Sequence, residues 1–264
     1  FENFIGLSKI KKGPIRVLMG PWTHGQRSVS YSGEIEFGPT AMLDGNLAES
    51  WWDFHVMWYD AWLKGLDNGI KDEPPIRLFI MGGGDGRKNA EGRMNHGGSW
   101  RFENEWPLAR TKFTNYYFHH DGLLSADAPS ASDPTTFQFD PDNPVPTIGG
   151  NLSGGIMTLA GGFHQQERPD FYGSKPPYLP LSSRHDVLVF QTTPLEEDVE
   201  VTGPVTVNLW VSSSALDTDF TAKLLDVCPP NEDYPDGFDL NLTDSIMRVR
   251  YRDSWENPEM VEPG

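Results

Sequence analysis

The spacing of apolar residues changes near residue 110, and this change constrains the fold more than any other feature. Before it, two short apolar runs at residues 15–19 and 76–81 flank a segment with helical periodicity at residues 44–66. Glycine and proline bound each run, as is typical of buried strands in a parallel sheet. Strand, helix and strand in this order favour a layered α/β arrangement. We therefore expect residues 1–110 to form an α/β unit.

The helical segment at residues 44–66 is rich in tryptophan. Its apolar side chains recur at intervals of three and four residues and form one stripe: Leu47, Trp51, Phe54, Trp58, Trp62 and Leu66. Asp44 can cap the start of a helix here, and Gly65 is a plausible stop. The pattern predicts an amphipathic helix that packs on the strands.

After Arg110 the helical period disappears and short β-rich runs follow, separated by Pro, Gly, Asn and Asp. In residues 205–211, Val and Leu alternate with Thr, Asn and Trp, so that one face is apolar. Short strands with regular turn signals predict an all-β sandwich or jelly roll over residues 111–264, with the domain boundary near 108–112. The expected strands lie in TNYYFHH, TTFQFD, DVLVFQT, VEVTGPVTVNLWVSSS, FTAKLLDV and SIMRVRYR.

Charge and composition exclude several classes of partner. The net charge of −17 argues against a nucleic-acid ligand and against electrostatic attachment to anionic lipid. No apolar run approaches the ~18–20 residues that a membrane span needs. The single cysteine, Cys228, excludes an internal disulfide and is expected to be a packed thiol. The chain starts at Phe1 and stops after a turn signal, so we expect it to be a segment of a longer protein. The sequence therefore does not determine the cellular compartment. It is also compatible with a homo-oligomer.

Residues 17–25, VLMGPWTHG, carry the strongest candidate for chemistry. His24 follows the first expected strand, and reactive groups of open α/β sheets gather beyond the carboxyl ends of strands. An imidazole placed there can act as a general base near neutral pH. The alternative is a loop histidine that only satisfies local hydrogen bonds. Trp22, two residues before it, could line a substrate pocket.

A histidine base needs a nucleophile and an orienting carboxylate, and this sequence offers neither in a suitable context. Only Ser8 and Glu2 precede His24 with the right chemistry, and no G-x-S-x-G motif occurs anywhere in the chain. The partners of a catalytic His24 would therefore lie outside these residues.

No metal or cofactor is expected. His119 and His120 are adjacent on an expected strand and face opposite ways, which is poor metal geometry. The acidic residues at 140–142 lack the glycine and bidentate glutamate of a calcium loop. No helical pattern follows the glycines at 82–84, so they do not indicate a dinucleotide site.

Several segments together resemble the superfamily of X-prolyl dipeptidyl aminopeptidases, cocaine esterases and α-amino-acid ester hydrolases. They occur in family order and cover nearly the whole chain. The matching segments are VLMGPWTHG, FHVMWYDAWLKG, PPIRLFIMG, FDPDNPVPTIGG, DVLVFQTTPLEEDVEVTGP, VSSSALDTDFTAKLLDV and IMRVRYRDS.

The resemblance implies the C-terminal portion of an α/β-hydrolase domain followed by a jelly-roll domain of the galactose-binding type. The family uses a serine in a G-x-S-Y-x-G turn, an aspartate, and the histidine of a G-P-W-x-H loop. Only the histidine maps onto this chain, at His24. Leu152 matches a position that can line the acyl pocket, and the resemblance assigns Asp217 to Phe220 a structural role.

The expected function is therefore that of one part of a serine hydrolase acting on small acyl esters, amides or peptides, with X-Pro dipeptidyl bonds among the candidates. His24 would be the general base, no cofactor would be needed, and this polypeptide alone would be inactive. The alternative is a β-sandwich module without catalysis, which would bind glycans or support oligomers. A metal-dependent hydrolase is a weaker alternative, because the sequence offers no ligand set.

Overall fold

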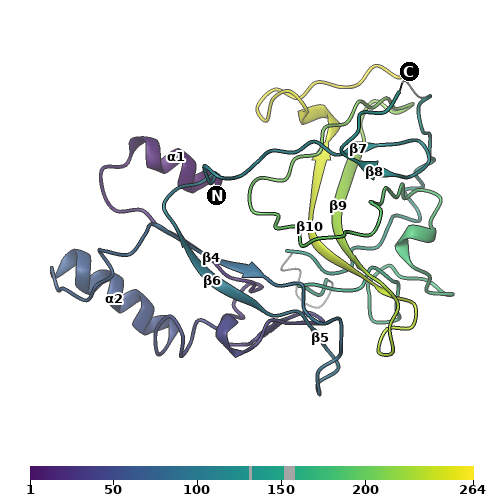
Figure 1. Cartoon of the computed structure of the whole chain (residues 1–264). Coiled ribbons are helices and arrows are strands. Elements are labelled where there is room, and N and C mark those ends of the chain that lie inside the picture. Colours follow the sequence, from purple (N-terminus) through teal and green to yellow (C-terminus); the bar gives the residue numbers. More distant parts are fainter. Residues whose placement is uncertain (131–132, 152–157) are drawn as a thin grey trace.

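The computed structural model describes residues 1–130, 133–151 and 158–264. Its first part holds a short helix, α1 (Glu2–Ile10), and a three-stranded sheet in the order β1-β4-β6. These strands are β1 (Val17–Met19), β4 (Ile76–Met81) and β6 (Gly98–Glu103). β4 pairs in parallel with β1 and antiparallel with β6, and β4 and β6 run side by side in Figure 1. The parallel pairing of the two predicted strands is thus present.

β1 differs from the prediction in its burial. The apolar run predicts a buried strand, but Met19 is 43% exposed and Val17 and Leu18 are half-buried. The reason is its place in the sheet, because β1 pairs with β4 along one edge and has no strand on its other edge among the described residues. An apolar run therefore marked the strand correctly but not its position at the edge of the sheet.

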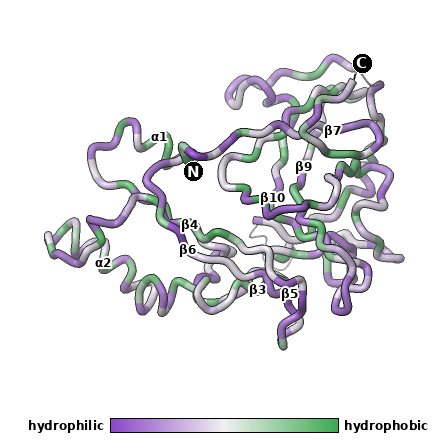
Figure 2. Tube along the Cα trace, in the orientation of Figure 1, coloured by the Kyte–Doolittle hydropathy of each residue, from purple (hydrophilic) through white to green (hydrophobic). Residues whose placement is uncertain are grey.

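The helix α2 (Trp51–Leu63) precedes β4 in the chain, and it is shorter than predicted. It begins at Trp51 because Ser50 is its cap: the Ser50 hydroxyl oxygen accepts a hydrogen bond from the Asp53 N–H at 3.3 Å. Asp44 is not the cap. Gly65 has a positive φ of 74° and lies just past the helix end, as the sequence predicts. Figure 2 shows apolar and polar positions alternating along this helix.

A second small sheet lies between α2 and the C-terminal part. It contains β2 (Tyr31–Ser32), β3 (Ile35–Glu36) and β5 (Met94–Asn95), in the order β2-β3-β5. A short 3-10 helix, η1 (Pro39–Ala41), follows β3. None of the helices in the described residues is long and apolar enough to cross a membrane.

The C-terminal part is dominated by one long antiparallel hairpin. Its strands are β9 (Asp219–Cys228) and β10 (Phe238–Arg248), which pair along their lengths with a bulge between Asn241 and Thr243. A smaller hairpin pairs β7 (Tyr117–Phe118) with β8 (Leu124–Ser125). Two short 3-10 helices, η2 (Leu181–Ser183) and η3 (Val249–Tyr251), complete the elements. The long hairpin stands in the C-terminal half of the molecule in Figure 1.

Several strands predicted after residue 110 are absent. Residues 135–140 and 199–214 form no strand, and residues 186–192 contribute one isolated bridge, between Gln191 and Leu123. Alternation defines two faces, but a strand also needs a neighbour to receive its backbone hydrogen bonds. Residues 205–211 have no such neighbour among the described residues, and Trp210 is 97% exposed.

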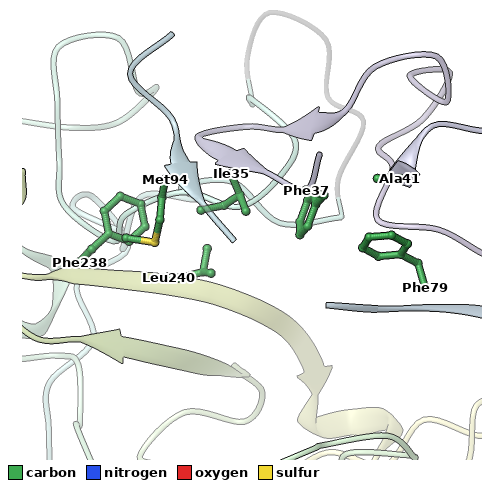
Figure 3. Packing of buried hydrophobic residues seen from close by; sticks show 7 residues of the cluster. All are labelled: Ile35, Phe37, Ala41, Phe79, Met94, Phe238 and Leu240. Carbon is green, nitrogen blue, oxygen red and sulfur yellow. The ribbon is translucent and has the colours of Figure 1, made fainter. Parts of the chain in front are cut away.

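One hydrophobic cluster joins residues from both sides of the predicted boundary at 108–112. Ile35 and Met94, on β3 and β5, are almost fully buried and pack with Leu240 of β10, as Figure 3 shows. The cluster consists of Ile35, Phe37, Ala41, Phe79, Met94, Phe238 and Leu240. The second small sheet therefore shares its core with the hairpin. The boundary itself stays a prediction.

Polar contacts reinforce this junction. Arg168 forms an ion pair with Glu34, and the His164 N–H donates a hydrogen bond to the same carboxylate at 3.1 Å. At the other end, the Lys88 N–H donates to Asp233 at 3.1 Å in the loop between β9 and β10. The N-terminal and C-terminal parts are thus held together by both apolar and polar contacts.

Candidate functional site

His24 lies at the corner of a tight turn that follows β1. The Gln26 N–H donates to the carbonyl oxygen of Thr23 at 3.2 Å, and the Thr23 hydroxyl donates to the Gln26 side-chain oxygen at 2.9 Å. Gly25 has a φ of 82°, which favours glycine at the third position of a turn of type II. The turn presents the exposed imidazole of His24 beyond the end of the strand.

Trp22 is fixed behind this turn. Its indole N–H donates to the carbonyl oxygen of Ala41 at 2.8 Å. The ring packs over Gly20, where an added Cβ would lie only 2.6 Å from the ring atoms. The Gly-Pro-Trp segment therefore has a local structural reason: glycine leaves the space that the indole occupies.

His24 and Trp22 line the same open cleft, which has a volume of about 340 Å³. Leu18 and Met19 of β1 line it as well, and so do Trp51 and Phe54 of α2. Since α2 begins at Trp51, its first turn brings two aromatic rings to the end of β1. The structure thus places both of the described residues predicted for the site in one cleft.

Arg27 also lines the cleft, although no motif in the sequence indicated it. Its guanidinium carbon lies 3.9 Å from the centre of the Trp51 ring, a close cation–π stack. His55 packs edge-on against the same indole at 4.1 Å, and its Nδ1 lies 2.8 Å from the Trp51 carbonyl oxygen. The only feature of the sequence that could have indicated Arg27 is its position, three residues after His24 and directly after the same turn.

The His24 ring nitrogens make no hydrogen bond to any described residue, so no carboxylate of this part of the chain orients the imidazole. The nearest acids by sequence position in the cleft region are used elsewhere. Asp44 accepts a hydrogen bond from the Ser28 hydroxyl, and Asp53 accepts one from the Ser50 hydroxyl at 2.6 Å. The described residues supply an imidazole in a cleft and not a complete triad.

The other residues that the sequence singled out within the described part of the chain lie outside this cleft. Leu152 falls outside the described residues. His119 contacts the Ser125 hydroxyl at 3.0 Å and is not part of a metal site; no group of three metal-ligating side chains occurs among the residues that the structure describes. Asp217 and Asp219 form ion pairs with Arg250 and Arg248 at 2.6 and 2.7 Å, next to the start of β9.

Two further titratable groups lie near the junction of the two parts, one buried and one half-buried. His96 is 4% exposed, and neither of its ring nitrogens has a hydrogen-bond partner among the described residues. Desolvation lowers the pKa of His96, although the charge of Asp226 on β9 opposes this effect. Burial raises the pKa of the Cys228 thiol to about 11, which agrees with a packed, unreactive cysteine.

Comparisons with known proteins give the chain its relatives. Residues 68–264 match the family model described as the X-Pro dipeptidyl-peptidase C-terminal non-catalytic domain. A cocaine esterase of Rhodococcus sp. (strain MB1 Bresler) is 33% identical over 258 residues, which are 94% of this chain and 38% of the esterase. The chain thus spans little more than a third of this relative, and the cleft residues precede the range matched by the family model.

Two solved structures share the fold. An aminopeptidase from a marine sediment archaeon, Thaumarchaeota archaeon, has a TM-score of 0.63 at 24% identity, covering 97% of this chain and 38% of that protein. An α-amino acid ester hydrolase has a TM-score of 0.62 at 24% identity, covering 94% of this chain and 38% of the hydrolase. At this identity the likeness concerns the fold alone.

Proposed function

Because this chain belongs to the family of the X-Pro dipeptidyl-peptidase C-terminal domain, we propose that it is one part of a serine hydrolase. In this proposal, residues 1–110 are the C-terminal portion of an α/β-hydrolase domain, and residues 111–264 are the jelly-roll domain that follows it. The intact enzyme would cleave small acyl esters, amides or peptides, with X-Pro dipeptidyl bonds among the candidates. It would need no cofactor.

The observation that carries the proposal is the position of His24. Its imidazole is exposed at the corner of a rigid turn, beside a cleft with apolar and aromatic walls. Ligand sites are commonly concave and mostly apolar, with a few polar groups that fix orientation. A turn after a strand of a parallel pair also holds the imidazole at the edge where α/β sheets gather their reactive groups.

The proposed reaction is acyl transfer. A serine hydroxyl from residues outside this chain attacks the carbonyl carbon of the substrate, and Nε2 or Nδ1 of His24 accepts the hydroxyl proton. The bond to the leaving group then breaks, and the imidazolium returns the proton to that group. In the second half, water attacks the acyl-enzyme, His24 takes a proton from this water, and the serine oxygen recovers it as the acid departs.

Residues 68–264 would support this site without touching the reacting atoms. The family description of this range is non-catalytic, and the cleft residues all lie before it. The shared cluster of Ile35, Met94 and Leu240 fixes the hairpin against the second small sheet. We therefore assign the C-terminal part mainly a structural role in holding the first part in place. Leu152, by its match to a pocket position of the family, would be its contribution to the acyl pocket.

The test uses the longer protein that carries this chain and a neutral ester such as phenyl acetate. His24→Ala should reduce turnover by about a thousandfold or more, because members of a triad act as a unit. His185→Ala is the matched control, since His185 is exposed and lies outside the cleft. Full activity of the His24→Ala protein would refute the proposal.

The isolated 264-residue chain gives a second test. Without the nucleophilic serine and the aspartate that orients His24, this chain should not hydrolyse phenyl acetate faster than free imidazole does in solution. A turnover of this chain that depends on His24 would show that its own residues complete the site, which contradicts the proposed division of the triad.

A further inference from the structure

Arg27 stands out among the residues of the cleft because its charge has no acidic partner there. No carboxylate of the described residues comes within ion-pair distance of its guanidinium, although the protein carries 38 acidic and only 21 basic residues. Most other arginines in this structure pair with Asp or Glu, for example Arg101 with Glu200 at 2.7 Å and Arg184 with Asp186 at 2.8 Å.

The stack on Trp51 leaves the hydrogen-bonding groups of Arg27 available. A cation–π contact uses the flat face of the guanidinium, whereas its five N–H donors point outward in the plane of the group. The guanidinium carbon lies 3.9 Å from the ring centre, and so close a contact restricts the rotation of the group. A planar fork held in one orientation suits a carboxylate, which can accept two parallel hydrogen bonds.

The neighbouring acids do not fill this role. Asp44 receives the Ser28 hydroxyl and Asp53 receives the Ser50 hydroxyl. Neither forms an ion pair with Arg27. The nearby cleft walls are apolar: Phe54, Trp22 and Leu18 line it together with Arg27 and His24. The cleft thus offers one fixed cation beside aromatic surface, three residues from the proposed general base.

The geometry points to Arg27 as a substrate-recognition residue that binds a carboxylate group of an acyl substrate, while the apolar part of that substrate rests on Trp22 and Phe54. That the bound molecule is a substrate rests on the proposed function, whereas the binding site itself depends only on the cleft and on the stacked arginine. The inference restricts the substrates to acyl compounds that carry both an apolar or aromatic group and a negative charge.

Direct binding to the 264-residue chain tests the site without any catalysis. The probes are benzoate and benzamide, which have nearly the same shape and differ in charge. Benzoate should bind about tenfold more tightly than benzamide at low salt, since hydrogen bonds to charged groups are the stronger ones. The preference should fall as ionic strength rises. Isothermal titration calorimetry or ligand-observed NMR measures both affinities.

Arg27→Gln should abolish the preference for benzoate, and Arg27→Lys should retain part of it, because a lysine keeps the charge without the planar fork. Arg93→Gln is the matched control: Arg93 also stacks on an aromatic ring, that of Tyr31, at 3.6 Å, but it lies outside the cleft. Thermal unfolding of each variant shows whether it is folded. Equal binding of the two probes, or an unchanged preference in Arg27→Gln, overturns the inference.

Activity of the longer protein separates this inference from the proposed function. The substrates are 4-acetoxybenzoate and its neutral methyl ester, which present the same acetyl group. Arg27→Gln should raise KM about tenfold for the anionic ester and leave the neutral ester nearly unchanged, whereas His24→Ala should reduce kcat for both. One outcome would refute the role of Arg27 and leave the hydrolase proposal intact. In that outcome His24→Ala loses activity on both esters, while the wild type hydrolyses the anionic and the neutral ester equally well.

Discussion

Leu240→Ala tests whether the hairpin and the second small sheet share one core. Leu240 is 1% exposed and packs against Ile35 and Met94. The substitution removes three carbon atoms, each worth about 0.8 kcal/mol of transfer free energy, or about 2.4 kcal/mol together. The cavity adds to this loss because strands on both sides limit how far the site can collapse. We expect the free energy of unfolding to fall by about 3–4 kcal/mol.

Leu242→Ala is the matched control, because Leu242 lies two residues further along β10 and is 38% exposed. It should cost about 1 kcal/mol or less, since much of its surface stays in water. Urea unfolding followed by circular dichroism gives both values. Similar losses in the two variants would show that Leu240 is not in a continuous core.

Amide hydrogen exchange then shows where the loss is felt. If the cluster couples the two parts, Leu240→Ala should speed exchange in β10 and also in the peptide containing β5 and β6, although the latter is distant in sequence. Faster exchange confined to β9 and β10 would refute the reasoning, since the hairpin would then open without the small sheet.

Three other predictions follow from single residues. Because burial lowers the folded-state pKa of His96, the unfolded chain binds a proton more readily than the folded chain, and the free energy of unfolding should fall as the pH drops below about 6.5. His96→Gln should remove part of this loss, which unfolding at pH 7.5 and 5.5 measures. Gly20→Ala should destabilise the fold by about 1–3 kcal/mol because its Cβ meets the Trp22 ring, whereas Gly6→Ala in α1, which has open space, should be neutral or stabilising in thermal unfolding. With a thiol pKa of about 11, Cys228 should react with Ellman's reagent at pH 8 far more slowly in the native chain than in urea, and equal rates would contradict its packing.

The sequence predicts the local features of this fold well. The two apolar runs become β1 and β4 in parallel pairing, and Gly65 ends α2 where its missing Cβ permits a positive φ. The long strand β9 also falls within the run FTAKLLDV and its flanks. The strand character of each run and the end of the helix at Gly65 depend on neighbours within a few residues, so the local pattern is sufficient for them. The parallel pairing of β1 and β4 joins distant residues and was expected only from the order of strand, helix and strand.

Features that depend on distant residues could not be predicted in this way. Alternation at residues 205–211 describes faces but does not say whether a neighbouring strand exists. The stack of Arg27 on Trp51 joins positions 24 residues apart, and it involves the first residue of α2, which is capped by Ser50 rather than by Asp44. The sequence therefore predicted that His24 and Trp22 belong to a site, but it did not predict that Arg27 lines the same cleft.

The contact between Ile35 and Leu240 also bears on how the protein is made. It closes a loop of about 200 residues, and the entropy lost in closing a loop grows with its length, although slowly. Chains with such long-range contacts fold slowly. During synthesis, β3 leaves the ribosome long before β10 is made, so Ile35 and Met94 stay exposed to water until Leu240 is available to pack against them. We expect a newly made chain to depend on protection from aggregation until β10 has emerged.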